Sequence, residues 1–218
     1  MSAGKTDRGA PRAKAPAQRN NRDIINLRRT QLTAAAYRVV SRKGYYNFTI
    51  KDIAREAGLS TGLVHYYFKD KQELLFTLLK EMNNNLRVYL NRALAKSDDP
   101  REKLSIFLDQ AFSLVEREKD YFHVLIDFWT QINHNERIRR ANVKLFESFR
   151  IEVSAIIHEG IREGHFRKVD VPYIAMVIVS LVQGAIIQYV LDRAAFNYAE
   201  YTGRIKAQVL ELMQKKAR

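Results

Sequence analysis

Hydrophobic side chains recur every three or four residues along most of the chain, and no stretch alternates with a period of two. A spacing of three to four residues places apolar side chains on one face of an α-helix. Glycine, proline, aspartate and asparagine interrupt the pattern at intervals, as they do at helix ends. The pattern predicts an all-α fold without strands. The expected helices cover residues 23–44, 49–58, 61–68, 70–98, 101–118, 121–134, 136–163, 171–194 and 198–216.

The segment before the first expected helix has a different composition. Residues 1–21 contain alanine, proline, glycine, arginine, lysine and asparagine, with hardly a large apolar side chain. Such a segment cannot bury enough surface to offset the entropy of ordering. We expect a disordered basic tail, which either only aids solubility or adds phosphate and minor-groove contacts on DNA. The remaining chain divides into a small domain, residues 22–70, and a larger one, residues 71–218.

Residues 50–69 carry the pattern of two short helices that cross closely. Gly58 lies where the turn between them favours a left-handed backbone. Thr49, followed three residues later by Asp52, resembles a capping box that starts the first helix. These steric features predict a helix-turn-helix. The positions that can turn inward are apolar or small: Ile53, Ala54, Ala57, Leu59, Val64 and Tyr67.

The opposite face of the second short helix is small, polar and basic. Small side chains near a helix N-terminus let the backbone approach base edges, and the helix dipole favours phosphate. A purely structural helical hairpin has less reason to combine these residue types on one exposed face. We therefore expect this face to contact DNA. Its members are Ser60, Thr61, Gly62, His65, Tyr66 and Lys69.

The continuous stretch TIKDIAREAGLSTGLVHYYFKDKQELL, residues 49–75, resembles the DNA-binding signature of the tetracycline-repressor (TetR) family. The resemblance covers roughly residues 25–80 and implies a dimer that binds a palindromic operator in double-stranded DNA. It also implies a repressor that a small-molecule effector releases by entering the C-terminal domain.

The resemblance assigns individual contacts as well. It implies that Thr49, Tyr66 and Lys71 hold phosphates, and that four residues face the major groove: Thr61, Gly62, Leu63 and His65. His65 departs from many relatives, which have tyrosine there, so the base preference at this position stays open. His65 either makes a plain hydrogen bond or titrates near neutral pH.

The charge distribution agrees with a DNA-binding N-terminal lobe. Residues 1–80 hold 16 Lys and Arg against 6 Asp and Glu, whereas residues 81–218 hold 21 against 18. A basic lobe on a nearly balanced body suits a polyanion such as DNA, and membrane phosphate is the alternative. The absence of cysteine favours a cytoplasmic protein. Residues 171–191 are uncharged and long enough to span a membrane, but with Pro172 and Gln183 among them we expect a buried helix and no membrane partner.

Aromatic residues in the second domain indicate a cavity for the effector. The helix expected at 121–134 has several of them on one face, with plain core as the alternative reading. The predicted ligand-binding residues are Phe107, Ala111, Phe122, Leu125, Phe128, Trp129, Met176 and Gln183. The pattern of Phe128-Trp129, Arg139-Arg140, Phe146, Gly160, Gly164, Phe166 and Asp170 is similar to the choline-responsive subgroup of the family.

The last two long helices are expected to pair two copies of the chain. Gly184 and Ala185 permit a close crossing, and two such helix pairs make a four-helix bundle. The predicted interface residues are Gly184, Ala185, Gln188, Leu191, Ile205, Val209 and Leu212.

Other functions find little support in the sequence. His123 and Asp127 are one helical turn apart, but no complete metal-ligand motif accompanies them. Nucleotide-binding loops and the nucleophile elbow of hydrolases are missing, so we expect neither an enzyme nor a cofactor. A protein that coats nucleic acid or membranes through charge alone remains the second alternative, and it predicts binding without sequence preference.

Overall fold

The computed structural model describes residues 16–215, with side chains described from Asp23 onward except at position 119. All regular structure in this part of the chain is helical, which confirms the predicted all-α class. The helices are α1 (Pro16–Lys43), α2 (Ile50–Ala57), α3 (Thr61–Tyr67), α4 (Lys71–Leu94), α5 (Pro100–Arg117), α6 (Lys119–Trp129), α7 (Glu136–Arg162), α8 (Val171–Leu191) and α9 (Tyr198–Met213).

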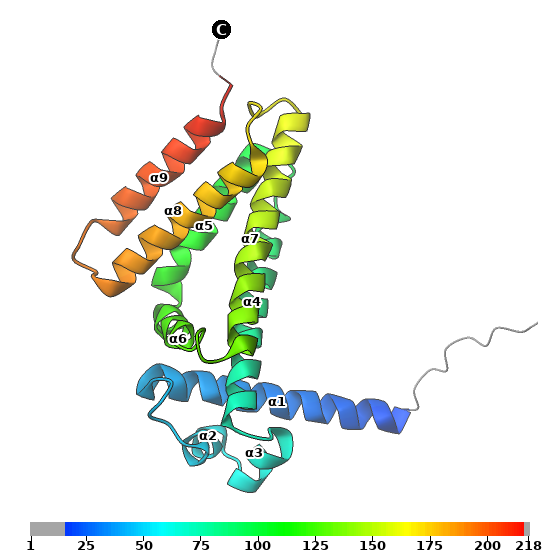
Figure 1. The fold of residues 1–218 in the computed structure, drawn as a ribbon. Coiled ribbons are helices and arrows are strands. Elements are labelled where there is room, and N and C mark those ends of the chain that lie inside the picture. Colours follow the sequence, from blue (N-terminus) through cyan, green and yellow to red (C-terminus); the bar gives the residue numbers. More distant parts are fainter. Residues whose placement is uncertain (1–15, 216–218) are drawn as a thin grey trace, which may run out of the picture.

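Helices α1 to α3 form a small base, and the remaining helices form a tall body above it (Figure 1). Helix α1 lies across the base, with α2 and α3 beneath it. Helix α4 begins in the base and continues into the body, where it packs against α5 and α7. Helix α8 packs mainly against α7, and α9 lies on the outer side of the body. Since α4 is one continuous helix that belongs to both parts, it connects the base to the body.

Two helices differ most from the predicted bounds, α1 at its start and α6 at its end. Helix α1 begins at Pro16, so residues 16–21 of the expected tail are helical, while residues 1–15 lie outside the described part. Extending an existing helix needs no new nucleus, so even polar residues can be added to its end. Helix α6 ends at Trp129, because the amides of Gln131 and Ile132 bond to carbonyls three residues back and tighten the chain into turns.

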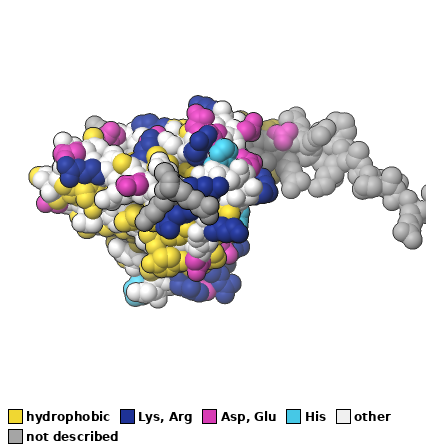
Figure 2. All heavy atoms as spheres, turned by 90° about the horizontal axis from the view of Figure 1, so that it is seen from above, with side chains coloured by type: hydrophobic (Ala, Val, Ile, Leu, Met, Phe, Trp, Pro, Cys, Tyr) yellow, Lys and Arg dark blue, Asp and Glu magenta, His cyan; other side chains and the backbone are white. Residues whose placement is uncertain are grey.

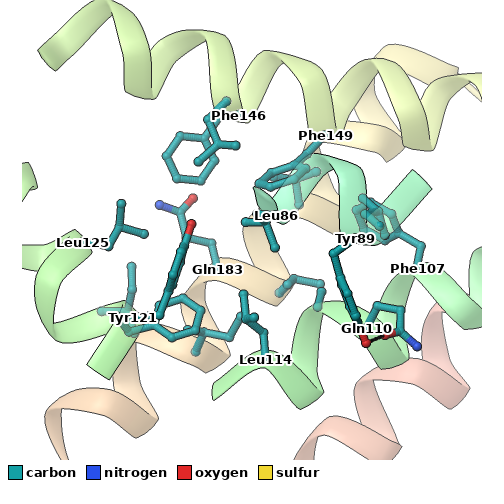
Figure 3. A pocket seen from close by; sticks show the side chains of 18 of the residues that line it. Leu86, Tyr89, Phe107, Gln110, Leu114, Tyr121, Leu125, Phe146, Phe149 and Gln183 are labelled. Atoms are coloured by element: carbon teal, nitrogen blue, oxygen red, sulfur yellow. Dashed lines mark hydrogen bonds between the residues drawn. The ribbon is translucent and has the colours of Figure 1, made fainter. Parts of the chain in front are cut away.

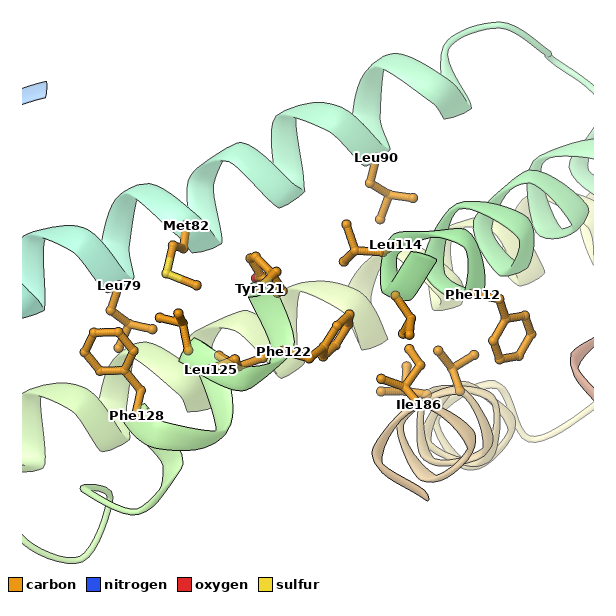
Figure 4. Packing of buried hydrophobic residues seen from close by; sticks show 14 of the residues in the cluster. Leu79, Met82, Leu90, Phe112, Leu114, Tyr121, Phe122, Leu125, Phe128 and Ile186 are labelled. Carbon is orange, nitrogen blue, oxygen red and sulfur yellow. The ribbon is translucent and has the colours of Figure 1, made fainter. Parts of the chain in front are cut away.

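Buried side chains from several helices form one continuous core (Figure 4). Leu79 and Met82 of α4 lie over Leu125 and Phe128 of α6, and Ile186 of α8 closes the far side. Short α6 therefore lies at the end of the body that is next to the base.

Helix α8 is long and apolar enough to cross a membrane by length and composition alone. Val171, Ile174, Ile178 and Val182 are buried within the chain. Only 39% of its most apolar window is buried inside the chain, so the predicted buried helix is confirmed for one face of α8.

Candidate DNA interface and effector cavity

Local hydrogen bonds start α2 and turn it sharply into α3. The Thr49 hydroxyl accepts from the Asp52 amide at 3.2 Å, and the Asp52 carboxylate accepts from the Thr49 amide at 2.8 Å, as the predicted capping box requires. Gly58 ends α2 with φ +66°, and its amide bonds back to α2. The Ser60 hydroxyl accepts from the Leu63 amide at 3.2 Å and caps α3. The two short helices therefore form a helix-turn-helix.

Helix α1 holds both short helices in place. The Arg29 guanidinium donates to the Tyr67 carbonyl at 2.6 Å and lies 4.3 Å from the centre of the Phe68 ring. The Gln31 amide donates to the Ala57 carbonyl at 2.9 Å. These bonds satisfy carbonyls at the C-terminal ends of α3 and α2. This role of α1 was not predicted, although an arginine and a glutamine on its polar face were the available signal.

The two faces of α3 are divided as predicted. Val64 and the adjacent Phe68 are buried, and so are Ile53, Ala54 and Ala57 of α2. On the other face the Tyr66 side chain is 73% exposed and Leu63 is 41% exposed. Among the remaining predicted DNA contacts, Thr49, Ser60, Gly62, His65 and Lys69 are exposed, and Thr61 is half-buried.

Lys71 differs from the other predicted phosphate ligands because it has partners within the chain. Its ammonium donates to the Phe48 carbonyl at 3.0 Å and lies 3.8 Å from the centre of the Phe48 ring. Burial lowers the pKa of Lys71 below its ordinary value. Lys71 therefore anchors the connector between α1 and α2, residues 44–49.

A cavity lies inside the body, bounded by α4, α5, α6, α7 and α8 (Figure 3), and about 90 Å³ of it is open to the centre of a water-sized sphere. Its wall is almost entirely apolar and aromatic and contains no charged side chain. This apolar and aromatic character suits a small organic molecule. Six predicted ligand residues line the cavity: Phe107, Ala111, Phe122, Leu125, Trp129 and Gln183.

Two predicted ligand residues are not in the wall. Phe128 is fully buried but faces the base, where its ring meets Tyr45 edge-on at 5.4 Å. Met176 is 48% exposed on the outer side of α8. Both errors arise because apolar residues surround α6 and α8, so periodicity alone cannot tell which side faces the cavity.

Much of the cavity wall comes from residues that were not predicted to bind a ligand. Helix α4 supplies Leu86, Tyr89 and Leu90, and α7 supplies Phe146 and Phe149. These residues read as ordinary core in the sequence, and only the packing of α4 and α7 around α6 reveals their position.

Most polar groups in the wall already have partners. The Trp129 indole donates to Asn142 at 3.0 Å, and the Tyr89 hydroxyl donates to the Gln110 side chain. The Tyr121 hydroxyl is buried and has no hydrogen-bond partner among the described residues. Burial, with a smaller effect of Tyr37, raises the pKa of Tyr121 well above its ordinary value, so this phenol stays protonated.

The far side of α6 contacts the connector that leads from α1 to α2. The Tyr45 amide donates to the Asp127 carboxylate at 2.9 Å, and the Gln131 amide donates to the Tyr46 hydroxyl. The Asp127 carboxylate thus binds α6 to the N-terminal domain. One short helix lines the cavity and holds the connector next to the helix-turn-helix.

The predicted pairing surface requires a correction. Ala185, Ile205 and Val209 are buried within the single chain, so they belong to its own core. Gln188, Leu191 and Leu212 are exposed, and Gly184 is half-buried. The exposed apolar side chains of α8 and α9 are Tyr173, Met176, Leu181, Leu191, Tyr201 and Leu212.

A helix-turn-helix with a polar exposed face, on a helical body, defines the class of helix-turn-helix DNA-binding regulators. Comparison with known families agrees. Residues 32–78 match "Bacterial regulatory proteins, tetR family", and residues 100–214 match "BetI-type transcriptional repressor, C-terminal". The chain belongs to the TetR family and has a BetI-type C-terminal domain. It is a DNA-binding transcriptional regulator and not an enzyme.

Individual relatives support the assignment. The HTH-type transcriptional regulator BetI of Agrobacterium fabrum is 31% identical over 173 residues, which cover 79% of this chain and 82% of that protein. BetI of Brucella anthropi is 30% identical over 114 residues, which cover 52% of this chain and 59% of that protein.

Solved structures share the fold. A transcriptional regulator from Saccharomonospora viridis in complex with choline gives a TM-score of 0.80 at 22% identity, covering 88% of this chain and 100% of its own. FadR from Bacillus subtilis in complex with stearoyl-CoA gives 0.70 at 19% identity, covering 85% and 99%.

Proposed function

We propose that this regulator is a cytoplasmic homodimeric repressor that binds a palindromic operator and is released when a small molecule fills the cavity. The observation that carries the proposal is the position of α6, which lines the cavity on one side and holds the connector through Asp127 on the other. A ligand that binds more tightly when α6 is shifted changes the spacing or tilt of the two helix-turn-helix units in the dimer. This change lowers operator affinity.

Pairing is supported by the exposed apolar face of α8 and α9. Seen from the end opposite the helix-turn-helix, hydrophobic side chains are exposed in the left part of the view, where these helices lie (Figure 2). A two-fold pair of the helices makes a four-helix bundle that removes this surface from water. The two α3 helices would then read half-sites about one helical turn, roughly 34 Å, apart.

The DNA contacts divide into two groups in this proposal. Thr61, Gly62, Leu63 and His65 face base edges, whereas Thr49, Ser60, Tyr66 and Lys69 lie beside phosphates. Lys71 contributes mainly by holding the connector, because its ammonium already has carbonyl partners. The contribution of residues 1–15 lies outside the described part of the chain.

The first test is selection of bound duplexes from a genomic DNA pool at physiological salt with excess nonspecific competitor. A palindrome supports the proposal, whereas recovery of no common sequence contradicts it. Tyr66→Phe should then weaken binding to all sequences by a similar factor, while Thr61→Ala should change the preference at particular base pairs. Transcription from the selected site, with and without the protein, distinguishes a repressor from an activator.

The same operator tests release. Choline is a candidate effector, because a structural neighbour contains it and the BetI-type domain is shared. A molecule that releases the operator makes operator affinity higher in its absence than in its presence. Asp127→Ala should reduce this ratio of affinities, because it removes the bond to the connector. Asp120→Ala, which alters an exposed residue of the same helix, should leave the ratio unchanged. An unchanged ratio in Asp127→Ala contradicts the proposed route.

A further inference from the structure

The hydrogen-bonding groups of the cavity wall can be counted one by one. Tyr89 is paired with Gln110, and Trp129 is paired with Asn142. The Tyr121 hydroxyl from α6 is buried without a partner among the described residues, and the Gln183 amide from α8 also lines the cavity. In Figure 3 the Tyr121 ring extends into the cavity, with its hydroxyl at the inner end. Both remaining groups are uncharged.

An unpaired hydroxyl in such a place needs an explanation. Tyr121 is only 6% exposed, and a buried polar group without a partner destabilises the folded chain. Its ring also borders a second, more polar groove between α1 and α4, which contains Tyr37, Glu81 and Glu118. No bond to any of these groups satisfies the hydroxyl. The hydroxyl oxygen also has almost no surface open to the empty cavity, so a ligand atom would satisfy it once neighbouring side chains move aside.

The remainder of the wall determines the charge of that ligand. The lining contains no carboxylate to balance a cation and no lysine or arginine to balance an anion. Burying an ion without a partner is costly, and contact with aromatic rings offsets only part of the cost for a cation. An uncharged ligand avoids this penalty.

We propose that the cavity binds an uncharged, largely apolar molecule carrying one hydroxyl, carbonyl or amide group, which pairs with Tyr121 and Gln183. This inference rests on the proposed effector function and specifies its ligand class. Because the phenol is a donor, the ligand group must offer an oxygen or nitrogen acceptor. The apolar part of the molecule lies among the aromatic rings of α6 and α7.

The protein contains its own reporter for the test. Trp129 is the single tryptophan of the chain and lines the cavity, so its fluorescence responds to an occupant. We would titrate the full chain with three neutral ten-carbon probes, namely decan-1-ol, 2-decanone and decanamide. Decanoate, decyltrimethylammonium and choline are the charged comparison. At least one neutral probe is expected to bind ten times more tightly than every ion.

Matched variants identify the group that recognises the probe. Tyr121→Phe should weaken the best neutral probe about fivefold, the usual effect of losing one neutral hydrogen bond, and should raise the Tm of the empty protein by about 2–4 °C. Gln183→Leu should also weaken the probe. Tyr37→Phe alters only the neighbouring groove, so it should leave probe affinity within twofold.

Each other outcome overturns the inference. It fails if no neutral probe binds, if an ion binds equally well, or if Tyr121→Phe leaves affinity or Tm unchanged. Operator release is measured separately. Release by choline without binding of any neutral probe would leave the repressor proposal intact and remove this one. Binding of a neutral probe without an effect on operator affinity would support the inferred ligand class and contradict release of the operator by the ligand.

Discussion

Gly58 and Gly62 lie four residues apart and meet different needs. Gly58 has φ +66°, a conformation that side chains with a Cβ rarely adopt. Gly62 has ordinary helical geometry, and a Cβ there would meet only the Ser60 hydroxyl, at 3.9 Å. The fold therefore does not require glycine at position 62. Close approach of α3 to DNA is a reason for its presence.

Gly62→Ala separates these two explanations. Alanine favours a helix over glycine by up to about 1 kcal/mol, so the free energy of unfolding should stay the same or rise. Operator affinity should fall at least tenfold, because the methyl group occupies space needed by the bases. Denaturant unfolding and fluorescence anisotropy measure the two quantities. Gly203→Ala on α9, where a Cβ also has open space, should leave DNA binding unchanged.

Asp52 gives a prediction for pH. Its carboxylate accepts from Lys43 at 2.8 Å and from Thr49, and these contacts, that of Lys43 foremost, hold its pKa well below the ordinary value. A depressed folded-state pKa stabilises the protein above the unfolded value, about 3.9, and this stabilisation is lost as pH falls towards the folded value. The difference in Tm between wild type and Asp52→Asn should therefore be largest near pH 7 and shrink below about pH 4. A difference that widens in acid would contradict this account. Asp98→Asn, without an ion pair in the described region, is the control.

At the scale of elements, the turn from α7 to α8 depends on one close contact. The ring of buried Phe166 lies against Gly160, where a Cβ would come within 2.1 Å of the ring. The amides of His165 and Phe166 both bond to the Gly160 carbonyl, so the ring has little freedom to move away. Gly160→Ala should lower the free energy of unfolding by about 1–3 kcal/mol through overpacking. Urea denaturation measures the change, and Gly203→Ala, where a Cβ has open space, should keep or raise the free energy of unfolding.

The helices also show which features periodicity can predict. In α2 and α3 one face is apolar and the other polar, so both the elements and the orientation of Val64 and Tyr66 were predicted correctly. In α8 apolar residues occur all round, and two side chains were misplaced: Ala185, predicted at the pairing surface, faces the core, while Met176, predicted to bind the ligand, faces outward. Burial inside the chain and burial between chains require the same residue types, so sequence alone cannot separate them.

For the whole molecule, the range of contacts along the chain determines what can be predicted. The helix-turn-helix is formed by neighbouring residues, so capping and turn signals within residues 49–69 reveal it. The cavity brings together Leu86 of α4 and Ile186 of α8, a hundred residues apart in the chain. The sequence indicates the aromatic residues available for a cavity. Only the packing of five helices determines which of them line it and leaves Tyr121 without a partner.

The exposed face of α8 and α9 makes the last prediction at this scale. Leu181 is 42% exposed on α8 within this apolar surface, and proposed pairing would bury it. Leu181→Lys would then place a charge in a dry interface, whereas Leu27→Lys alters an exposed leucine of α1 on the base. Light scattering should give wild type and Leu27→Lys a mass of twice the 25.4 kDa chain, and Leu181→Lys a mass near that of one chain.

The monomeric Leu181→Lys variant should stay folded by circular dichroism, since the substitution leaves the core intact. It should lose its preference for the palindrome over an isolated half-site, because one α3 reads only one half. A dimeric Leu181→Lys would place the pairing surface elsewhere on the molecule.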